Sequence, residues 1–345
     1  MSLPELMIEG RVPRVVVTGA GGPAAVGLMR DESLRSIEWF AADIDPHAAG
    51  LHLVDADHRF LAKRADDPDF VDHLFDACVA AQADLVVPTV DAELLPMAAA
   101  VDRFEAAGMK VLIAGDMNTL NTVLDKVLLA EACQGVVPVP TTIALDESTD
   151  LSALSLPLIV KPRHGSGGRD VEIVSDPARL TTLAAVGDML AQQLLVGEEY
   201  SVDVLARADG SVAAAVPRAR LKVDSGIAVA ARTLHDDALE GGARAVVSHL
   251  GLRGIINVQF RRDEQGVAHL LEINPRLPGT MTITVASGID MPYWFVAEPL
   301  GSTIPEGLTF HDRGVVRFWE DQVIEDDAFA RLAATSTPAS LGSTA

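Results

Sequence analysis

The sequence contains few cysteines and few aromatic residues. Its two cysteines, Cys78 and Cys133, each lie inside an apolar stretch with helical spacing, which excludes a disulfide framework and a thiolate metal cage. Aromatic residues make up 4% of the chain, whereas hydrophobic residues make up 49%. The core is therefore expected to be aliphatic, as is typical of α/β proteins in which strands and helices alternate.

Basic charge is also scarce. The chain has 27 Lys and Arg residues against 49 Asp and Glu residues, which gives a formal net charge of -22. A surface this acidic repels nucleic-acid phosphates and anionic lipids, so we expect no nucleic-acid partner and no membrane partner. Any phosphate that the protein binds must be held by a local cluster of cations.

Long apolar runs are missing as well. No segment approaches the roughly 18 apolar residues of a membrane-spanning helix, and the first residues lack the basic-then-apolar pattern of a signal peptide. The sequence therefore predicts a cytoplasmic protein. Its 345 residues, at about 150 residues per domain, predict about two domains.

Short apolar runs alternate with helical stretches in the first third of the chain. Parallel strands joined by helices of this length need crossover connections, so the pattern predicts a parallel, doubly wound sheet. The expected strands are residues 12–18, 38–44, 58–62, 83–88 and 110–114, and the expected helices include residues 23–29, 69–81 and 92–107.

A glycine-rich turn, Gly19–Ala24, follows the first expected strand. It resembles a dinucleotide fingerprint, with Asp43 or Asp45 about 20 residues on where a ribose-binding acid would lie. Pro23 removes one amide that would face a pyrophosphate, so we favour the alternative that the glycines serve the turn itself. The segment Pro88–Glu93 follows the fourth strand, and its acids either meet a substrate or cap the next helix.

A lysine and a glycine-rich loop mark the middle of the chain. Residues 116–133 are expected to form a helix that contains Lys126, and residues 158–162 are expected to form an apolar strand that carries Lys161 near its end. The loop that follows, Arg163–Arg169, lies between two strands and so is not a Walker A loop. Glycine amides can close over phosphate oxygens beside a lysine, and the alternative is an ordinary mobile hairpin. The role of His164 in this loop stays open.

Two further segments carry polar groups suited to a nucleotide or an anion. Residues 192–203 join two strands through a glycine turn, where backbone groups could meet an adenine edge and Glu199 could accept from ribose hydroxyls. Arg218, Arg220 and Lys222 alternate along one expected strand and so face one side. They predict an anion site for a substrate carboxylate or acyl phosphate, unless they simply protect an exposed sheet edge.

The most informative segment is an expected hairpin of residues 255–262 and 267–274. Its turn is expected to pair position 257 with 272 and position 259 with 270. One face then carries oxygen ligands suited to Mg²⁺, and Arg276 follows close enough to hold a phosphoryl group. The expected apolar face is Ile256, Val258, Phe260, Leu271 and Ile273, and the expected polar face is Asn257, Gln259, Glu272 and Asn274.

Together these motifs resemble the ATP-grasp superfamily, most of all the single-unit relatives of the carbamoyl-phosphate synthase large chain. The resemblance rests on Lys161-Pro, the Gly-Ser-Gly-Gly loop, Gly197-Glu-Glu-Tyr-Ser-Val-Asp, Asn-Val-Gln259-Phe and Glu272-Ile-Asn-Pro-Arg276 in the family order. The chain has one such unit where the synthase has two, so the synthesis of carbamoyl phosphate itself is not implied.

The resemblance implies an α/β ATP-grasp fold, in which a Rossmann-like parallel sheet precedes two α+β subdomains that enclose the nucleotide. The implied ligands are ATP and Mg²⁺, with Mn²⁺ as an alternative ion. Its site residues would be Lys126, Lys161 and the loop residues Gly165, Ser166, Gly167 and Gly168 at the phosphates; Gln193, Leu194 and Leu195 at the adenine; Glu199 at the nucleoside; Gln259, Glu272 and Asn274 at the metal; and Arg276, with Arg220 and Lys222, at the reacting groups.

The resemblance further implies an ADP-forming carbon–nitrogen ligase. Such an enzyme joins a small carboxylate to an amine through an acyl phosphate, and amino acids are the expected substrates. A homodimer is an alternative to a monomer. Two alternatives are a nicotinamide oxidoreductase that uses the glycine turn, and an ATP-binding module without turnover. The expected divisions are residues 1–115, 116–191 and 192–331, then a flexible tail of residues 332–345; residues 314–319 are expected to form a closing strand with Trp319 in the core.

Overall fold

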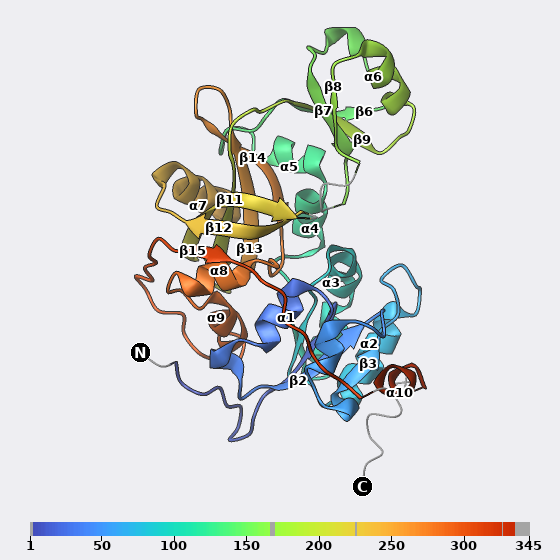
Figure 1. Ribbon diagram of the computed structural model, residues 1–345, viewed down its shortest axis with the longest axis vertical. Coiled ribbons are helices and arrows are strands. Elements are labelled where there is room, and N and C mark those ends of the chain that lie inside the picture. Colours follow the sequence, from blue (N-terminus) through green and yellow to red (C-terminus); the bar gives the residue numbers. More distant parts are fainter. Residues whose placement is uncertain (1–2, 166–169, 225, 326, 335–345) are drawn as a thin grey trace.

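The computed structural model describes residues 3–165, 170–224, 226–325 and 327–334, and three sheets organise them (Figure 1). The loop residues Ser166, Gly167 and Gly168 lie outside the described residues, as do residues 335–345 of the expected tail. Within the described ranges, no helix is both long and apolar enough to cross a lipid bilayer.

The amino-terminal sheet has five strands in the order β3-β2-β1-β4-β5, all parallel. This confirms the predicted doubly wound sheet. Val15 and Val17 of β1 enter one core and Val16 enters the other, because side chains alternate along a strand and helices cover both faces. The elements are β1 (Arg14–Val17), α1 (Pro23–Met29), η1 (Glu32–Leu34), β2 (Glu38–Asp43), η2 (Ala49–His52), η3 (Ala56–His58), β3 (Arg59–Leu61), α2 (Phe70–Ala80), β4 (Leu85–Val87), α3 (Asp91–Ala106) and β5 (Lys110–Val111).

A smaller antiparallel sheet, with the order β6-β9-β7-β8, forms the lobe at the top of Figure 1. Its own apolar cluster lies between the sheet and α6. The expected division after residue 191 falls inside β9, which pairs with both β6 and β7. The elements are β6 (Thr142–Leu145), η4 (Leu151–Ala153), β7 (Leu158–Pro162), β8 (Glu172–Val174), α6 (Pro177–Ala184) and β9 (Met189–Gln193).

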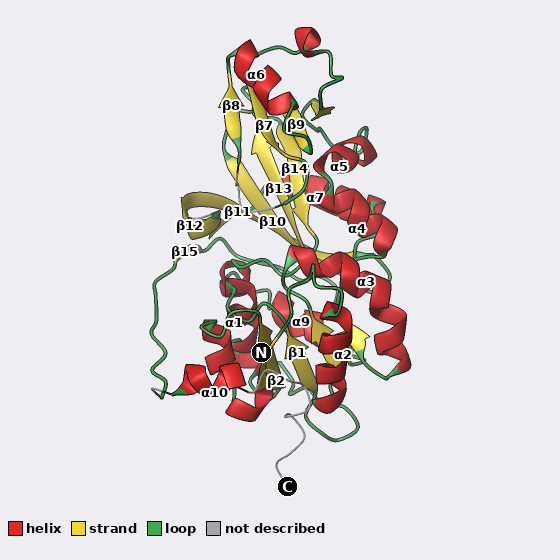
Figure 2. Ribbon diagram, turned by 90° about the vertical axis from the view of Figure 1, so that its right-hand side faces the viewer, coloured by secondary structure: helices red, strands yellow, loops and turns green. Residues whose placement is uncertain are grey.

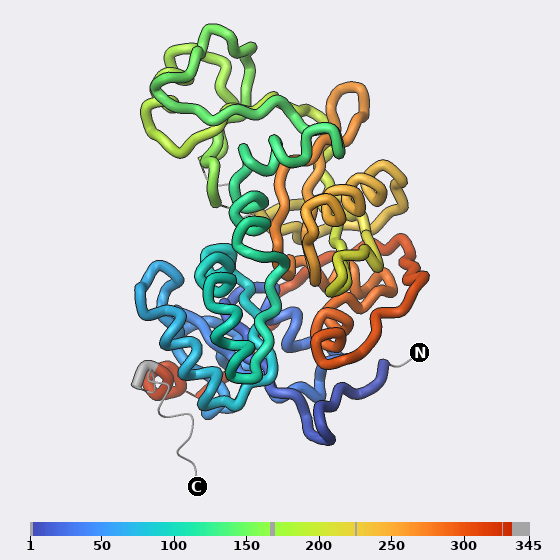
Figure 3. Tube along the Cα trace, turned by 180° about the vertical axis from the view of Figure 1, so that it is seen from behind, coloured from blue at the N-terminus to red at the C-terminus, as the bar shows by residue number. Residues whose placement is uncertain are grey.

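The third sheet has six strands in the order β14-β13-β10-β11-β12-β15. The helices α4, α5 and α7 share its core, so residues 117–132 pack on this sheet, and α5 also contacts β6 of the smaller one. Figure 3 shows this helical segment running alongside the hairpin β13–β14. The elements are α4 (Met117–Leu124), α5 (Lys126–Ala132), β10 (Glu199–Ala206), β11 (Val212–Asp224), β12 (Ile227–Thr233), α7 (Asp237–His249), β13 (Gly254–Arg262), β14 (Ala268–Asn274) and β15 (Gly314–Val316).

The amino-terminal and six-stranded sheets are joined by one continuous core. Val15 of β1 and Leu205 of β10 belong to the same apolar cluster, together with α8 (Met281–Ala286) and α9 (Met291–Ala297). A cluster shared in this way holds the two sheets as one body. The candidate site residues of the hairpin are therefore positioned by packing against the amino-terminal sheet.

The carboxyl-terminal segment differs from the expectation. After β15 the chain runs back along the molecule to α10 (Ala328–Ala334), as Figure 2 shows. This helix contacts β3. Leu332 is buried against Ala20, Ala48 and Leu51, so the start of the expected flexible tail is in fact a docked helix. Trp319 is 95% exposed, and its expected place in the core is wrong because the closing strand ends at Val316.

The glycine turn after β1 is shaped by packing. Gly19 has a positive φ of 59°, and a Cβ at this position would lie 2.5 Å from Val90 Cγ2. The backbone amide of Gly21 donates to Asp43 Oδ2 at 2.7 Å. The carboxylate that a nicotinamide dinucleotide would need for its ribose is therefore engaged with the turn, which favours the structural interpretation of the glycines.

A buried carboxyl group lies at the end of the same strand. Glu93 of α3 is 6% exposed, and the hydroxyl of Thr18 donates to its Oε2 atom. Burial raises the pKa of Glu93 to about 7, since the nearby Asp43 adds to the effect and the Thr18 hydrogen bond only partly opposes it. The protonated form of Glu93 is thus favoured by the fold.

The contact between η2 and the glycine turn gives a stability prediction. A Cβ on Gly50 would lie 1.9 Å from the carbonyl oxygen of Ala20, which is backbone and cannot rotate away. We expect Gly50→Ala to lower the free energy of unfolding by about 2–3 kcal/mol, measured by denaturant titration. Gly241→Ala in α7 is the control, because a Cβ there meets nothing within 4 Å; it should stabilise by about 0.5–1 kcal/mol. Equal effects of the two changes would contradict the packing argument.

The Glu93 pKa gives a prediction for pH. Its folded-state value is above the ordinary 4.5, so its contribution to stability is complete below pH 4.5 and is lost as the pH rises to about 7. Glu93→Gln cannot ionise and should not show this loss. As the pH rises from 4.5 to 7, the difference in free energy of unfolding between the variant and the wild type should change by about 3 kcal/mol in favour of the variant. Glu105→Gln, at an exposed position of α3, is the control. Parallel pH profiles for Glu93→Gln and the wild type would refute the assignment.

Candidate functional site

Two buried lysines form the centre of the candidate site. Lys161 of β7 is 9% exposed and Lys126 at the start of α5 is 8% exposed. Burial lowers the pKa of Lys161; Lys126 lowers it further, whereas Glu272 and Glu199 oppose the shift. Four residues expected from separate motifs therefore lie within electrostatic range of one another, on β7, α5, β10 and β14.

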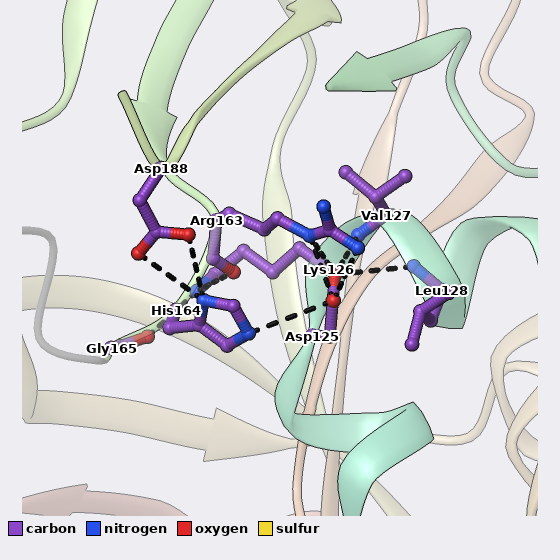
Figure 4. A network of polar contacts seen from close by, with 8 residues as sticks. All are labelled: Asp125, Lys126, Val127, Leu128, Arg163, His164, Gly165 and Asp188. Carbon is purple, nitrogen blue, oxygen red and sulfur yellow. Dashed lines mark hydrogen bonds and ion pairs between the residues drawn. The ribbon is translucent and has the colours of Figure 1, made fainter. Parts of the chain in front are cut away.

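Asp125 organises the base of the glycine loop (Figure 4). Its Oδ1 atom accepts from the amides of Val127 at 2.9 Å and Leu128 at 3.2 Å, which caps α5. The expected single helix over residues 116–133 is therefore divided into α4 and α5 at Asp125, which has extended backbone angles. Sequence reasoning passed over this residue, although an aspartate directly before a helical stretch is a standard capping signal.

The same carboxylate binds the start of the loop. Arg163 Nε donates to Asp125 Oδ1 at 2.8 Å and Oδ2 at 2.7 Å. Burial alone raises the pKa of Asp125, but Arg163 and the two capping amides outweigh it and keep the pKa below its ordinary value. His164 lies between Asp125 and Asp188 (Figure 4), so this histidine is paired with carboxylates.

The loop also contacts the first lysine. Lys126 Nζ donates to the carbonyl oxygen of Gly165 at 2.7 Å, the last residue described before the glycines. This bond and the Asp125–Arg163 pair together attach the first residues of the loop to the start of α5. The expected position of Gly165 beside a phosphate-binding lysine is consistent with this geometry.

The expected adenine hinge follows β9. Gln193 pairs with Thr141 through its backbone amide at 2.9 Å, and its side-chain oxygen accepts from the Thr141 amide at 3.4 Å. Leu195 is 3% exposed. The backbones of Leu194 and Leu195 make no hydrogen bond to any other residue that the structure describes.

Glu199 is held by arginines in this structure. It forms an ion pair with Arg220 Nη1, and Arg261 Nη1 lies 3.9 Å from its other oxygen. Arg220 also reaches Gln259 Oε1 at 3.5 Å and donates to the Gly226 carbonyl at 2.8 Å. Arg220 therefore links the expected nucleoside residue to the expected metal face.

The three expected cations of β11 do not form one cluster. Arg218 is 1% exposed and donates to both oxygens of Asp203 at 2.8 Å, so it belongs to the core. Lys222 is exposed and lies beyond an irregularity in the pairing of β11 with β12 at Leu221. The expectation is wrong for Arg218, because the buried carboxylate of Asp203 on the neighbouring strand already binds its guanidinium group.

The hairpin has a different register from the expected one. Asn257 pairs with Asn274 and Gln259 with Glu272, and a bulge at Leu271 then places Leu270 opposite Phe260. Leu270 is buried at 3% exposure, whereas Leu271 is half-buried, so Leu270 takes the expected core place of Leu271. A shift of two positions leaves side-chain faces unchanged, which is why the polar face is as expected.

The polar face fits a hard divalent cation. Gln259 and Glu272 lie opposite one another, and Asn274 is two residues beyond Glu272 on the same face. One carboxylate and two amide oxygens match the ligand preference of Mg²⁺ or Mn²⁺ and do not match that of zinc. These three residues could hold the ion that the resemblance implies.

Arg276 connects the hairpin to the amino-terminal domain. Its Nε and Nη2 atoms donate to Asp91 Oδ1 at 2.6 Å and Oδ2 at 2.8 Å, a bidentate pair. Asp91 begins α3, for which Val90 is the N-cap residue. Asp91 is therefore engaged by Arg276. Glu93 is engaged by the Thr18 hydroxyl and by the backbone amides of Val90 and Thr89 at the start of α3, as the capping alternative expects.

Two known families match separate parts of the chain. Residues 15–112 match the family described as "PylC-like, N-terminal domain". Residues 185–318 match the family described as "ATP-grasp in the biosynthetic pathway with Ter operon". The second match contains the expected adenine hinge, β11 and the hairpin β13–β14.

Curated relatives include large chains of carbamoyl phosphate synthase. The arginine-specific mitochondrial chain of Neurospora crassa is 27% identical over 225 residues, covering 59% of this chain and 19% of that protein. The large chain of Clavibacter michiganensis is 28% identical over 234 residues, covering 59% and 20%. The chain thus spans about a fifth of the length of these relatives.

Solved structures share the fold. N5-carboxyaminoimidazole synthetase from Staphylococcus aureus complexed with ADP has a TM-score of 0.70 at 15% identity, with 90% of this chain and 82% of that chain covered. The L-amino acid ligase of Bacillus licheniformis has a TM-score of 0.66 at 18% identity, with 84% and 75% covered. The chain therefore has an ATP-grasp domain and a PylC-like N-terminal domain, and it is homologous to the carbamoyl-phosphate synthase large chain.

Proposed function

We propose that this protein is an ADP-forming ligase that joins a carboxylate to an amine. The observation that carries the proposal is the convergence of Lys126 and Lys161 with Glu199 and Glu272. Two buried cations beside hard oxygen ligands suit the triphosphate of ATP and its divalent ion. The phosphoryl group would pass to the substrate carboxylate, and an amine would then displace phosphate from the acyl phosphate and form the amide.

The nucleotide would lie between the small sheet and the six-stranded sheet. Lys161 and Lys126 would contact its phosphates, and Gly165, whose carbonyl oxygen accepts from Lys126, would lie beside them. The uncommitted backbone groups of Leu194 and Leu195, after Gln193, would meet the adenine edge. Glu199 would exchange its pair with Arg220 for the ribose hydroxyls.

Gln259, Glu272 and Asn274 would hold Mg²⁺, or Mn²⁺ in its place. When bound, the ion neutralises charge on the phosphate oxygens and so lowers the barrier to phosphoryl transfer. Arg276 would leave Asp91 to hold the transferring group, because a bidentate guanidinium suits phosphate oxygens as well as a carboxylate. Arg220 and Lys222 would help to bind the negatively charged acyl phosphate.

The proposed substrates are a small carboxylate and a small amine, with amino acids as the first candidates. The names of similar proteins support this class, since one is an L-amino acid ligase and another a carboxyaminoimidazole synthetase. Positioning and charge neutralisation are the main demands of such a reaction. The site offers these through its lysines and arginines.

The central experiment measures ADP release from MgATP across a panel of amino acids and small carboxylates, singly and in pairs, with mass spectrometry of the products. We expect release that depends on one pair and a product lighter than the two substrates by one water. Binding of MgATP without release for any pair would favour a nucleotide-binding module. A thermal shift with NAD(H) and none with MgATP would refute the proposal.

Two substitutions test the site residues separately. Glu272→Ala should lower turnover by about 100-fold or more while the melting temperature changes little, because the residue is on the polar face of the hairpin. Glu264→Ala, in the exposed turn of the same hairpin, is the control and should leave turnover unchanged. Unfolding of the Glu272 variant would contradict the face assignment.

Lys161→Ala should weaken ATP binding by about 10-fold or more, because a charge-assisted contact to phosphate is lost. Isothermal titration calorimetry measures the affinity. Lys63→Ala, on the surface of the amino-terminal domain, is the matched control. Equal affinity of the Lys161 variant and the wild type would refute the phosphate role.

A further inference from the structure

A buried polar network lies beneath the proposed metal face. Asp203 of β10 is fully buried, and Arg218 of β11 donates to both of its oxygens at 2.8 Å. Thr284 of α8 donates to Oδ2 at 2.5 Å, and Asn257 Nδ2 of β13 donates to Oδ1 at 2.8 Å. The carboxylate thus accepts four hydrogen bonds from three other elements.

The Asp203 carboxylate determines which way the Asn257 amide points. An ionised carboxylate only accepts hydrogen bonds, whereas an asparagine side chain has one donor end and one acceptor end. Asn257 must therefore turn its NH₂ group toward Asp203. The two bonds from Arg218 prevent the carboxylate from rotating, so this orientation of Asn257 is the stable one.

The orientation of Asn257 in turn determines the orientation of the Asn274 amide. Asn257 and Asn274 are opposite one another in the hairpin, and Asn274 Nδ2 lies 3.5 Å from Asn257 Oδ1. Since Asn257 presents its oxygen on this side, Asn274 must present its NH₂ group in return. The carbonyl oxygen of Asn274 is then the end of the amide that is turned away from Asn257.

We propose that Asn257, oriented by the Asp203–Arg218 ion pair, is a positioning residue that directs the side-chain oxygen of Asn274 toward the divalent cation. The proposal rests on the proposed function, because it assumes that Asn274 is a metal ligand. A reversed amide would aim hydrogen atoms at the cation and offer no lone pair. The chain of hydrogen bonds therefore selects the useful one of two amide orientations before the ion binds.

The test measures Mn²⁺ affinity of the full chain in the presence of ADP, by the electron paramagnetic resonance signal of free Mn²⁺. Asn257→Leu removes the directing amide at similar volume and leaves the Asp203–Arg218 pair in place. We expect it to weaken Mn²⁺ binding by about 10-fold. Thr284→Val, which removes a bond to the other oxygen of Asp203, is the matched control and should stay within about twofold of the wild type.

A second substitution separates positioning from a general structural effect. Asn274→Asp adds a negative charge that should favour a cation, but in the wild-type background one carboxylate oxygen would face the oxygen of Asn257. We therefore expect Asn274→Asp alone to give no gain in Mn²⁺ affinity. Combined with Asn257→Leu, which removes the opposing oxygen, the same change should restore binding at least to the wild-type level.

The outcomes are distinct. A change of sign, in which Asn257→Leu weakens binding with Asn274 present and strengthens it with Asp at that position, supports the proposal. An equal loss in both backgrounds, or no loss, would overturn it. If Asn257→Leu does not fold, as judged by circular dichroism, a clear gain from Asn274→Asp alone is the overturning result. A wild-type chain that binds no Mn²⁺ with ADP would instead refute the metal site of the proposed function, and the positioning role with it.

Discussion

The ion pair between Asp203 and Arg218 is the contact on which the rest of the six-stranded sheet depends. Removing two charges from water costs several kcal/mol, and the cost is recovered only when every oxygen and nitrogen is hydrogen-bonded. Asp203 meets this condition through Arg218, Thr284 and Asn257. A register change in β11 or β13, or a shift of α8, would leave a buried charge without its partners, so the pair strongly favours one arrangement of these elements.

The position of the hairpin within the whole molecule comes from two other contacts. The apolar cluster that joins Val15 of β1 to Leu205 of β10 is continuous, so the two sheets form one packed body. The pair of Arg276 with Asp91 adds a directional bond at the end of the hairpin. The amino-terminal sheet thus supports the polar face, and its glycine turn is closely packed against η2.

Much of the fold follows from local patterns. Alternation and helical periodicity correctly predicted the five parallel strands and the hairpin, because these depend on which residues are apolar within a short window. The polar face of the hairpin was also predicted, since a register error of two positions does not change the face. The bulge at Leu271 and the break at Asp125 were missed, because each depends on hydrogen bonds that a periodic pattern does not represent.

The candidate site divides in the same manner. The sequence by itself determined which residue types are present and on which side of each strand they lie, so Lys161, Glu272 and Asn274 could be named in advance. Only the tertiary structure decided their partners: Arg218 joins the core and Arg220 the site, although the two are only two residues apart on β11. The physical reason is that charge interactions depend on distance and burial, which are set by residues far apart in the chain.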